Sequence, residues 1–347
     1  MKIYEFDPLR DGRWAKFVDR HPAASVFHSV GWLTALKQTY GYEPSVLTTC
    51  KTDSDLSNSL VFCRVQSWVT GRRLVSLPFS DHCQPLAEDG DTVATLISGL
   101  REVARAQGCK YIELRPVSWL TGARPSFAPS RNLCLHRLDL RYGLQEIFRR
   151  FHGDCIRRKI RRAEREVLTV LEGRTPEIVG QFYGLVVRTR KRHGLPPQPL
   201  GWFKRLVECL GPALTVRIAY KSSLPVAGIL TLQHRNALTY KYGASDERFH
   251  NLGGMPYLFW LAIQDAVGRG LHEFDLGRSD LEHAGLIAFK EHLGASRSDL
   301  SYWRSPAPEV MRSTRHSWGL DLIRHTCAHI PDNCLTTLGT LVYRHIG

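Results

Sequence analysis

Residues 271–303, LHEFDLGRSDLEHAGLIAFKEHLGASRSDLSYW, contain the pattern that decides the fold: a strand, a turn, a helix and a second strand. The apolar residues before Gly277 predict the first strand, and this glycine is expected to end it. Ser279 with Glu282 three positions later forms a capping box, which predicts a helix that ends at Gly294. A helix that returns the chain to the same sheet is a crossover unit, so the sequence predicts an α/β protein with a mixed sheet.

The predicted helix carries Lys290 among apolar neighbours. Leu286, Phe289 and Leu293 recur at helical spacing and predict the buried face. No carboxylate lies three or four positions from Lys290, so its ammonium is expected on a cleft wall that meets an anion. The alternative is a lysine that lies over apolar surface with its charge in water. Arg278, between strand and helix, is a second candidate for ligand binding, with an ordinary surface arginine as its alternative.

Composition narrows the class of protein. The chain has 347 residues, 43% of them hydrophobic, and a formal net charge of +14, which favours phosphate-bearing partners without choosing among them. The nine cysteines are odd in number and scattered, which predicts reduced thiols, a cytoplasmic setting and no metal site. The N-terminus lacks the apolar run of a signal peptide, and no stretch is long enough to span a membrane.

The first half of the chain predicts helices followed by a meander. Helical patterns occur in residues 14–40, with Gly41 as a stop, and short strands are expected at 45–49, 60–65 and 73–77. A further helix at 92–107 ends at Gly108 and precedes a strand at 109–115.

An internal repeat links this half to the opening stretch. ARAQGCKYIELR at 104–115 matches AVGRGLHEFDLGR at 266–278 over a glycine that ends a helix, an acidic residue and a leucine. Both copies stand at the same place in the order of elements. The sequence therefore predicts two related domains in tandem, at 1–140 and 168–305, joined by a connector at 141–167 and followed by a tail at 306–347.

The connector is strongly basic. Residues 148–167, FRRFHGDCIRRKIRRAEREV, are expected to form one helix with an apolar stripe, on which Arg149, Arg150 and the cluster 157–159 have no obvious acidic partner. One interpretation is a phosphate-binding wall formed by Arg157, Arg158, Lys159 and Arg162. The other is a solvated helix that only joins two domains.

The second half has a legible order of elements. A strand at 168–172 precedes helices at 176–192 and 200–210, then strands at 213–220, 225–234 and 237–244. A helix with Pro256 in its first turn runs to Gly268 before the opening unit. The predicted order is β, α, α, β, β, β, α, β, α, β.

This order, with the motifs YKYGAS, FDLGR and GLIAFKEHLGA, resembles the GNAT acyltransferase fold and specifically the FemAB-like tandem GNAT family, over residues 24–303. The resemblance implies transfer of an acyl or aminoacyl group to an amine in cell-envelope or polysaccharide synthesis. It also implies that Phe289 and Lys290 contact the donor, and that Tyr240 and Ser245 help to bind substrate. Tyr242 and Asp275 are expected to handle protons beside a gap between strands 237–244 and 272–277.

The donor is a separate question. A GNAT enzyme that uses CoA binds pyrophosphate at a helix N-terminus with a glycine-rich motif, where this chain has HNLGGM at 250–255. Met255 is expected to crowd a close approach, while Gly253 and Gly254 could hold an anion or form a plain helix entry. No tightly bound cofactor is expected, and aminoacyl-tRNA is favoured over acyl-CoA. A non-catalytic anion-binding or scaffold protein with the same fold is the competing interpretation.

The tail is predicted to be helical and amphipathic. Trp318, Leu322 and Ile323 form one stripe, and Leu338, Leu341 and Val342 form another. Packing on the chain's own domains is expected, and peripheral contact with the inner face of a membrane is the alternative left open.

Overall fold

The computed structural model describes residues 2–120, 127–307 and 325–347. The chain divides into two compact units, Met1–Cys134 with Asp299–Val310 and Val342–Gly347, and Leu135–Ser298 with Met311–Leu341. These limits differ from the predicted domains, because strand β12 (Ser296–Ser305) pairs with β5 (Tyr111–Leu114) of the first unit, Trp303 opposite Leu114. The domain limits at 140, 167 and 305 remain a prediction.

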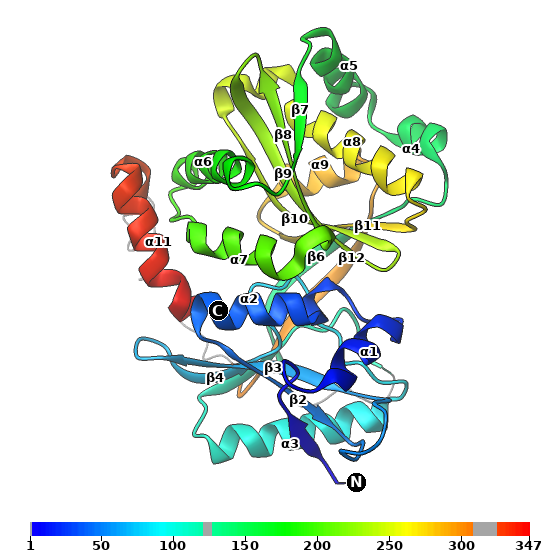
Figure 1. The fold of residues 1–347 in the computed structure, drawn as a ribbon, viewed down its shortest axis with the longest axis vertical. Helices are drawn as coiled ribbons and strands as arrows, with labels where there is room; N and C mark the ends of the chain where they lie inside the picture. The colour runs from blue at the N-terminus through cyan, green and yellow to red at the C-terminus, as the bar shows by residue number, and fades with distance from the viewer. Residues whose placement is uncertain (1, 121–126, 308–324) are drawn as a thin grey trace. The chain divides into compact units, whose positions relative to one another are not determined.

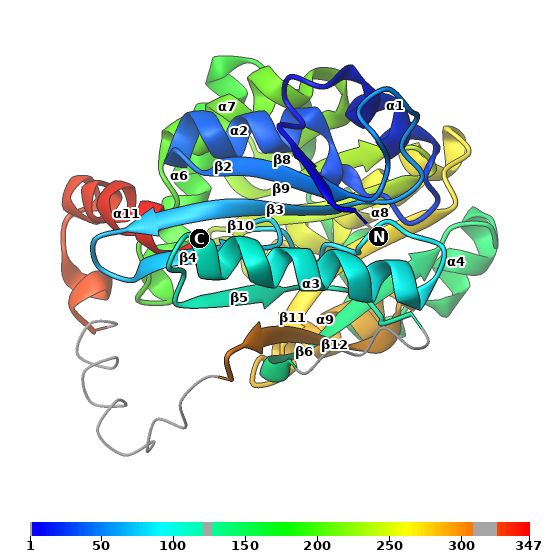
Figure 2. The ribbon, with the colours of Figure 1, turned by 90° about the horizontal axis from the view of Figure 1, so that it is seen from below.

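The first unit is a sheet with helices on both faces. The strands lie in the order β1-β2-β3-β4-β5-β12. Strands β1 to β4 pair with one another in antiparallel, and β4 pairs with β5 in parallel. Figure 2 shows α1 and α2 on one face of this sheet and α3 on the other. The elements before β5 are β1 Tyr4–Phe6, α1 Gly12–Arg20, α2 Val30–Tyr40, β2 Glu43–Thr48, β3 Leu60–Ser67, β4 Gly71–Val75 and α3 Gly90–Ala106.

The predicted helices and meander of this unit are confirmed. Gly41, with a φ of 72°, caps α2 as expected, and Gly108, with a φ of 61°, follows α3. The sequence patterns missed β1 and the long strand β6, Ala128–Asp139, whose start belongs to this unit.

The second unit has the predicted order of elements. Its strands follow the order β6-β11-β10-β9-β8-β7, and Figure 1 shows α6 and α7 on one side of them, with α8 and α9 on the other. Buried apolar side chains pack the helices together, since Ile160 of α5 and Phe259 of α8 belong to one buried cluster. The elements are α4 Leu144–Arg150, α5 Arg158–Arg165, β7 Thr169–Gly173, α6 Pro176–Arg192, α7 Leu200–Leu210, β8 Leu214–Lys221, β9 Leu224–His234, β10 Ala237–Ser245, α8 Gly254–Gly268, β11 Glu273–Asp280 and α9 Ala284–His292.

Two local predictions in the opening stretch are wrong. Strand β11 continues past Gly277 to Asp280, because the glycine takes a φ of 70° inside the strand and turns it without ending it. Ser279 lies buried in β11, and the N-cap of α9 is His283, so no capping box forms at Ser279. The end of α9 beside Gly294, which has a φ of 75°, is as predicted.

The buried face of α9 differs in part from the predicted one. Ile287 and Lys290 are the buried residues of this helix, whereas Leu286 is 39% exposed. Leu293, just after the helix, is buried and Phe289 is partly buried, as predicted.

The basic connector is not one helix. It consists of α4, a break at Phe151 and His152, and a π-turn at Gly153–Arg157 that continues directly into α5. Phe151, Ile156 and Ile160 are buried, but Val167, expected on the apolar stripe, is 74% exposed because the helix has already ended. The connector belongs to the second compact unit.

The tail falls partly outside the described residues, among them the stripe of Trp318, Leu322 and Ile323. Helix α11, Asp332–Ile346, buries Leu335 and Tyr343, while Leu341 is exposed. The stripe predicted at Leu338, Leu341 and Val342 is therefore displaced around the helix.

Gly339 explains the displaced stripe, because a Cβ at this position would lie 2.0 Å from the carbonyl oxygen of Pro197. Near the end of the chain, Tyr42 donates a hydrogen bond to the carbonyl of Tyr343, and Arg73 donates to the carbonyl of Gly347 at 2.8 Å. The described tail thus packs on the chain itself. Among the described helices, none is long and apolar enough to cross a bilayer.

Candidate acyl-donor site

Strands β10 and β11 pair over a short stretch and then separate. Their parallel register covers Ala237 to Thr239 opposite Glu273 to Asp275, although β10 continues to Ser245 and β11 to Asp280. Parallel strands that stop pairing expose backbone groups and leave room for a ligand between them. This is the gap expected from the sequence.

A β-bulge in β10 sends two neighbouring tyrosines to opposite faces. The register with β9 shifts between Tyr240 and Tyr242, so the usual two-residue alternation is broken. The ring of Tyr240 lies 4.8 Å from that of Phe259 on α8. Tyr242 instead packs on Phe203 of α7 at 5.1 Å, and its hydroxyl accepts a hydrogen bond from Trp202 Nε1 at 2.8 Å.

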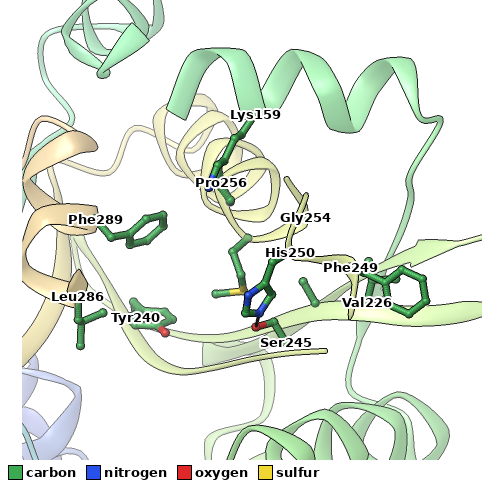
Figure 3. Close-up of a pocket in the computed structure, with 12 residues that line it drawn as sticks. Lys159, Val226, Tyr240, Ser245, Phe249, His250, Gly254, Pro256, Leu286 and Phe289 are labelled. Atoms are coloured by element: carbon green, nitrogen blue, oxygen red, sulfur yellow. Dashed lines mark hydrogen bonds between the residues drawn. The ribbon is translucent and has the colours of Figure 1, made fainter. Parts of the chain in front are cut away.

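A pocket of about 250 Å³ opens beside the free part of β10. Its walls come from β9, β10, α5, α8 and α9 of the second unit, and Figure 3 shows Phe289 and Leu286 facing His250 across it. The lining is mainly apolar, with a few polar groups, which is typical of a small-molecule site. The lining residues are Lys159, Val226, Ala227, Tyr240, Ser245, Phe249, His250, Gly254, Met255, Pro256, Leu286 and Phe289.

A serine and a histidine meet at this pocket. Ser245 Oγ and His250 Nε2 lie 2.8 Å apart, and Arg192 Nη1 lies 3.4 Å from the same nitrogen. Burial first, and the charge of Arg192 second, lower the pKa of His250 below 6.5. A neutral imidazole that accepts a hydrogen bond from a hydroxyl can act as a general base.

His250 is the residue that sequence analysis missed. It stands in HNLGGM at 250–255, whose glycines carry the resemblance to an anion-binding helix entry. A serine followed by histidine five positions later carries no periodic signal, because a 3₁₀ turn at Glu247–Leu252 folds the histidine back.

The glycines at the start of α8 are required by packing. Gly253 has a φ of 80°, and a Cβ there would lie 2.2 Å from the carbonyl oxygen of Lys159. A Cβ at Gly254 would approach that of Ala227 to 3.1 Å. Gly254 lines the pocket together with the Met255 side chain, so this helix entry is a close fit and not a flexible one.

Lys290 is buried and holds the turn in β11. Its ammonium donates to the carbonyl oxygens of Gly277 at 2.8 Å and Arg278 at 3.1 Å, and its exposed fraction is 1%. The alternative of a lysine lying over the surface is thus contradicted. Phe289, the preceding residue, does line the pocket, and its ring stacks edge-on against Phe259 at 5.3 Å.

Asp275 and Arg278 lie along the same strand. Asp275 is buried, and its Oδ1 accepts the backbone N–H of Gly277 at 2.7 Å. Arg278 is half-buried. The structure therefore brings together Tyr240, Ser245, Phe289, Gly254 and Lys159 at the pocket, whereas Tyr242, Asp275, Arg278 and Lys290 are not among its lining residues.

The charges of the basic connector are partly paired. Arg149 and Arg150, expected to lack partners, both bind Glu146 at 2.7 Å. Arg158 lies 3.4 Å from Asp154, and Arg162 lies 3.1 Å from Glu166. Glu146 precedes the two arginines by three and four positions, so helical spacing accounts for both pairs, but it lies outside residues 148–167.

Part of the chain is similar to a known protein family. Residues 154–290 match the family model of the acetyltransferase (GNAT) domain. The predicted resemblance to GNAT acyltransferases is confirmed over these residues, and it supports an acyl or aminoacyl transferase. No curated protein sequence matches it significantly.

Solved structures extend the GNAT fold to most of the chain. FemX superposes with a TM-score of 0.67 at 14% identity, over 87% of this chain and 97% of that one. A tandem GNAT protein from the clavulanic acid biosynthesis pathway gives 0.55 at 13%, over 88% and 98%. The C-terminal domain of a putative lysylphosphatidylglycerol synthetase from Agrobacterium fabrum gives 0.56 at 15%, over 86% and 91%. The fold is a FemAB-like tandem of GNAT-like units, as predicted.

Proposed function

We propose that the GNAT domain transfers an acyl or aminoacyl group from a phosphate-bearing donor to an amine, and that the donor's acyl group lies in the pocket beside β10. The observation that carries this proposal is the position of the pocket. It lies where β10 and β11 stop pairing, at the N-terminus of α8, and it contains the Ser245–His250 pair. An apolar cavity of this size accommodates an acyl chain or an amino-acid side chain.

The phosphates of the donor would meet helix α5 and the start of α8. Lys159 lines the pocket, and among the described residues its ammonium forms no ion pair. Arg157, Arg158 and Arg162 extend the positive charge along the same segment. The N-terminus of α8 adds backbone N–H groups and the positive end of the helix dipole.

Aminoacyl-tRNA is our preferred donor, and acyl-CoA is the alternative. The exposed basic face of α5 is longer than a single pyrophosphate needs, and the Met255 side chain occupies space at the helix entry. The names of the structural neighbours include both chemistries. One is a putative lysylphosphatidylglycerol synthetase, and another is described without AcCoA.

The reaction needs a neutral amine and a path for its proton. The amine nitrogen attacks the donor carbonyl, and the N–C bond forms as the C–O bond of an ester, or the C–S bond of a thioester, breaks. The hydroxyl of Ser245 passes its proton to His250 Nε2 and receives the proton of the amine. His250 then gives its proton to the leaving alkoxide or thiolate, which departs as the alcohol or thiol, so that no charge is left over.

The acceptor that we propose is an amine of a cell-envelope precursor or a polysaccharide. This rests on the fold shared with FemX and with the putative lysylphosphatidylglycerol synthetase domain. Peripheral contact with a membrane that carries such an acceptor is part of the same proposal.

The test compares donors in parallel. Purified full-length protein is incubated with a panel of amines and either radiolabelled aminoacyl-tRNA or radiolabelled acetyl-CoA. We expect transfer from aminoacyl-tRNA with a KM that rises steeply with salt, because several phosphate contacts release counterions. Lys159→Ala should flatten this dependence, and Lys204→Ala on the exposed side of α7 should not. Turnover with acetyl-CoA alone would overturn the preferred donor, and a salt slope unchanged by Lys159→Ala would remove α5 from the donor site.

A further inference from the structure

The π-turn between α4 and α5 brings three metal-ligating side chains together. His152, Cys155 and His292 each offer one ligand atom, and these atoms all lie within 4.8 Å of one another. His152 and Cys155 stand at the start of the π-turn, and His292 is the last residue of α9. His152 and His292 are far apart in sequence, so no local sequence motif predicts the cluster.

The backbone holds these residues in place. The N–H of His152 donates to the carbonyl of His292 at 2.9 Å, and the two rings lie 4.4 Å apart. His152 Nδ1 accepts the N–H of Cys155 at 3.2 Å, so Nδ1 carries no proton in the neutral ring. Its lone pair is thus already directed toward the segment that carries Cys155.

We propose that His152, Cys155 and His292 bind a divalent transition metal ion of the Zn²⁺ class. One thiolate and two imidazoles form a borderline-soft set that suits Zn²⁺ or Co²⁺ and not Mg²⁺ or Ca²⁺. His152 Nδ1 would ligate in place of its weak contact with the Cys155 amide. Three protein ligands leave a fourth position for water.

Nearby positive charges are partly offset. Glu146 binds both Arg149 and Arg150 and offsets one of their two charges, and Arg158 is paired with Asp154. A Cys155 thiolate would add one negative charge at the centre of the cluster. Arg157 also lies beside the turn, since its Nη2 lies 3.4 Å from where a Cβ of Gly153 would be.

Such a metal would cross-link two walls of the pocket. The π-turn leads directly into α5, which carries Lys159, and α9 carries Leu286 and Phe289. Tying their ends together would restrict how far the pocket can open. This consequence rests on the proposed function, whereas the binding of metal does not.

The experiment uses the full-length chain, stripped with a chelator and kept reduced, with Co²⁺ as the spectroscopic probe. We expect one Co²⁺ per chain, a near-ultraviolet band from thiolate-to-cobalt charge transfer, and displacement by Zn²⁺. Cys155→Ser should abolish the band, and His292→Asn should weaken Co²⁺ binding by tenfold or more. Cys209→Ser, a half-buried thiol on α7, should leave both unchanged.

Each other outcome contradicts the site. A band that survives Cys155→Ser, or wild-type protein that binds Co²⁺ without this band, would place the metal elsewhere. The double change His325→Ala and His329→Ala removes a histidine pair with rings 4.3 Å apart, and loss of binding in that variant alone would assign it to the tail. Zn²⁺ should also raise the Tm of the wild type and not of His292→Asn. Failure of acyl transfer with normal cobalt binding would overturn only the proposed function.

Discussion

The two copies of the internal repeat differ in the residue at their end, two positions after a shared acidic residue. In the first unit β4 and β5 pair in parallel with Val75 opposite Glu113, and in the second unit β10 and β11 pair with Thr239 opposite Asp275. Each copy thus has an acid at the same place. What differs is the residue two positions later, which is Arg115 in the first copy and Gly277 in the second.

Arg115 fills the end of the first copy. Its guanidinium binds the Glu113 carboxylate at 2.8 Å and donates to the carbonyls of Leu77 at 3.1 Å and Ser80 at 3.4 Å. Arg304 also binds Glu113, at 3.1 Å. The Glu113 carboxylate thus belongs to a buried network of ion pairs and hydrogen bonds, and this network has a structural role.

Gly277 leaves the second copy without a side chain at that place. The Asp275 carboxylate accepts the N–H of Gly277, and Lys290 from α9 binds the carbonyl beyond it. The backbone turns here with no guanidinium group filling the space, and the pocket lies beside β10, the strand that pairs with β11. We infer that one copy has become structural and that the other keeps the chemistry.

Arg115→Ala should have the largest effect, on stability. Removing the guanidinium leaves Glu113 buried with Arg304 as its remaining partner, and breaking a buried pair costs about 3 kcal/mol or more. Arg105→Ala, on the exposed side of α3, should stay within about 0.5 kcal/mol of wild type. Urea unfolding, followed by hydrogen exchange of peptides around β5, measures both. Equal values for the two variants would contradict a structural role for the first copy.

The pH dependence of this stability has a definite sign. Burial would raise the pKa of Glu113, but Arg115 and Arg304 outweigh it and lower the pKa below 4.5. A carboxyl group whose pKa is lower in the folded than in the unfolded protein stabilises the fold at pH values above its unfolded-state pKa. This stabilisation is lost as the pH falls through its folded-state pKa. The difference between wild type and Arg115→Ala should therefore narrow in acid.

His250→Gln should have the next largest effect, on catalysis in the second copy. Loss of a general base lowers kcat by about a hundredfold or more. Because the pKa of His250 is lowered, wild-type activity should fall only below pH 6.5, as the imidazole becomes protonated. The variant should lack this acid limb.

The matched control is His193→Gln. Burial and Arg192 lower the pKa of His193 as well, but this residue is not among those that line the pocket. It should retain both the rate and the pH profile of the wild type. A pH profile of His250→Gln that matches the wild type would remove the histidine from the proton path.

Lys290→Ala should have a smaller effect on transfer, together with a measurable loss of stability. Two carbonyls of β11 lose their buried donor, which costs about 1–3 kcal/mol. The turn that carries Arg278 should shift, and transfer should fall on the order of tenfold. An unchanged melting temperature would contradict the observed burial of Lys290. Lys204→Ala is the surface control.

The order of elements could be predicted because it depends on local patterns. Helices α6 and α7 begin and end at the residues predicted for them, with Thr175 and Pro176 at the start of α6 and Gly211 after α7. The resemblance to GNAT enzymes rested on these same elements. Strand β1 was missed because three residues carry too little periodicity.

The site was harder to predict because it depends on two irregular turns. The bulge between Tyr240 and Tyr242 puts the two side chains on opposite faces, whereas strict alternation would put them on the same one. The positive φ of Gly277 extends β11 and moves the start of α9, which buries Lys290. His250 and the cluster around Cys155 come from contacts that no sequence spacing encodes.

Hydrogen exchange of the full chain with and without donor tests the central claim most directly. Aminoacylated total tRNA and acetyl-CoA are added separately, without acceptor, and deuterium uptake is compared at the matching places of both copies. We predict that the bound donor protects residues 240–256 and 284–292 of the second unit, and that residues 75–82 and 111–115 of the first unit are unchanged. Protection at 75–82 and 111–115, with none at 240–256, would contradict the assignment of the donor site to the second copy.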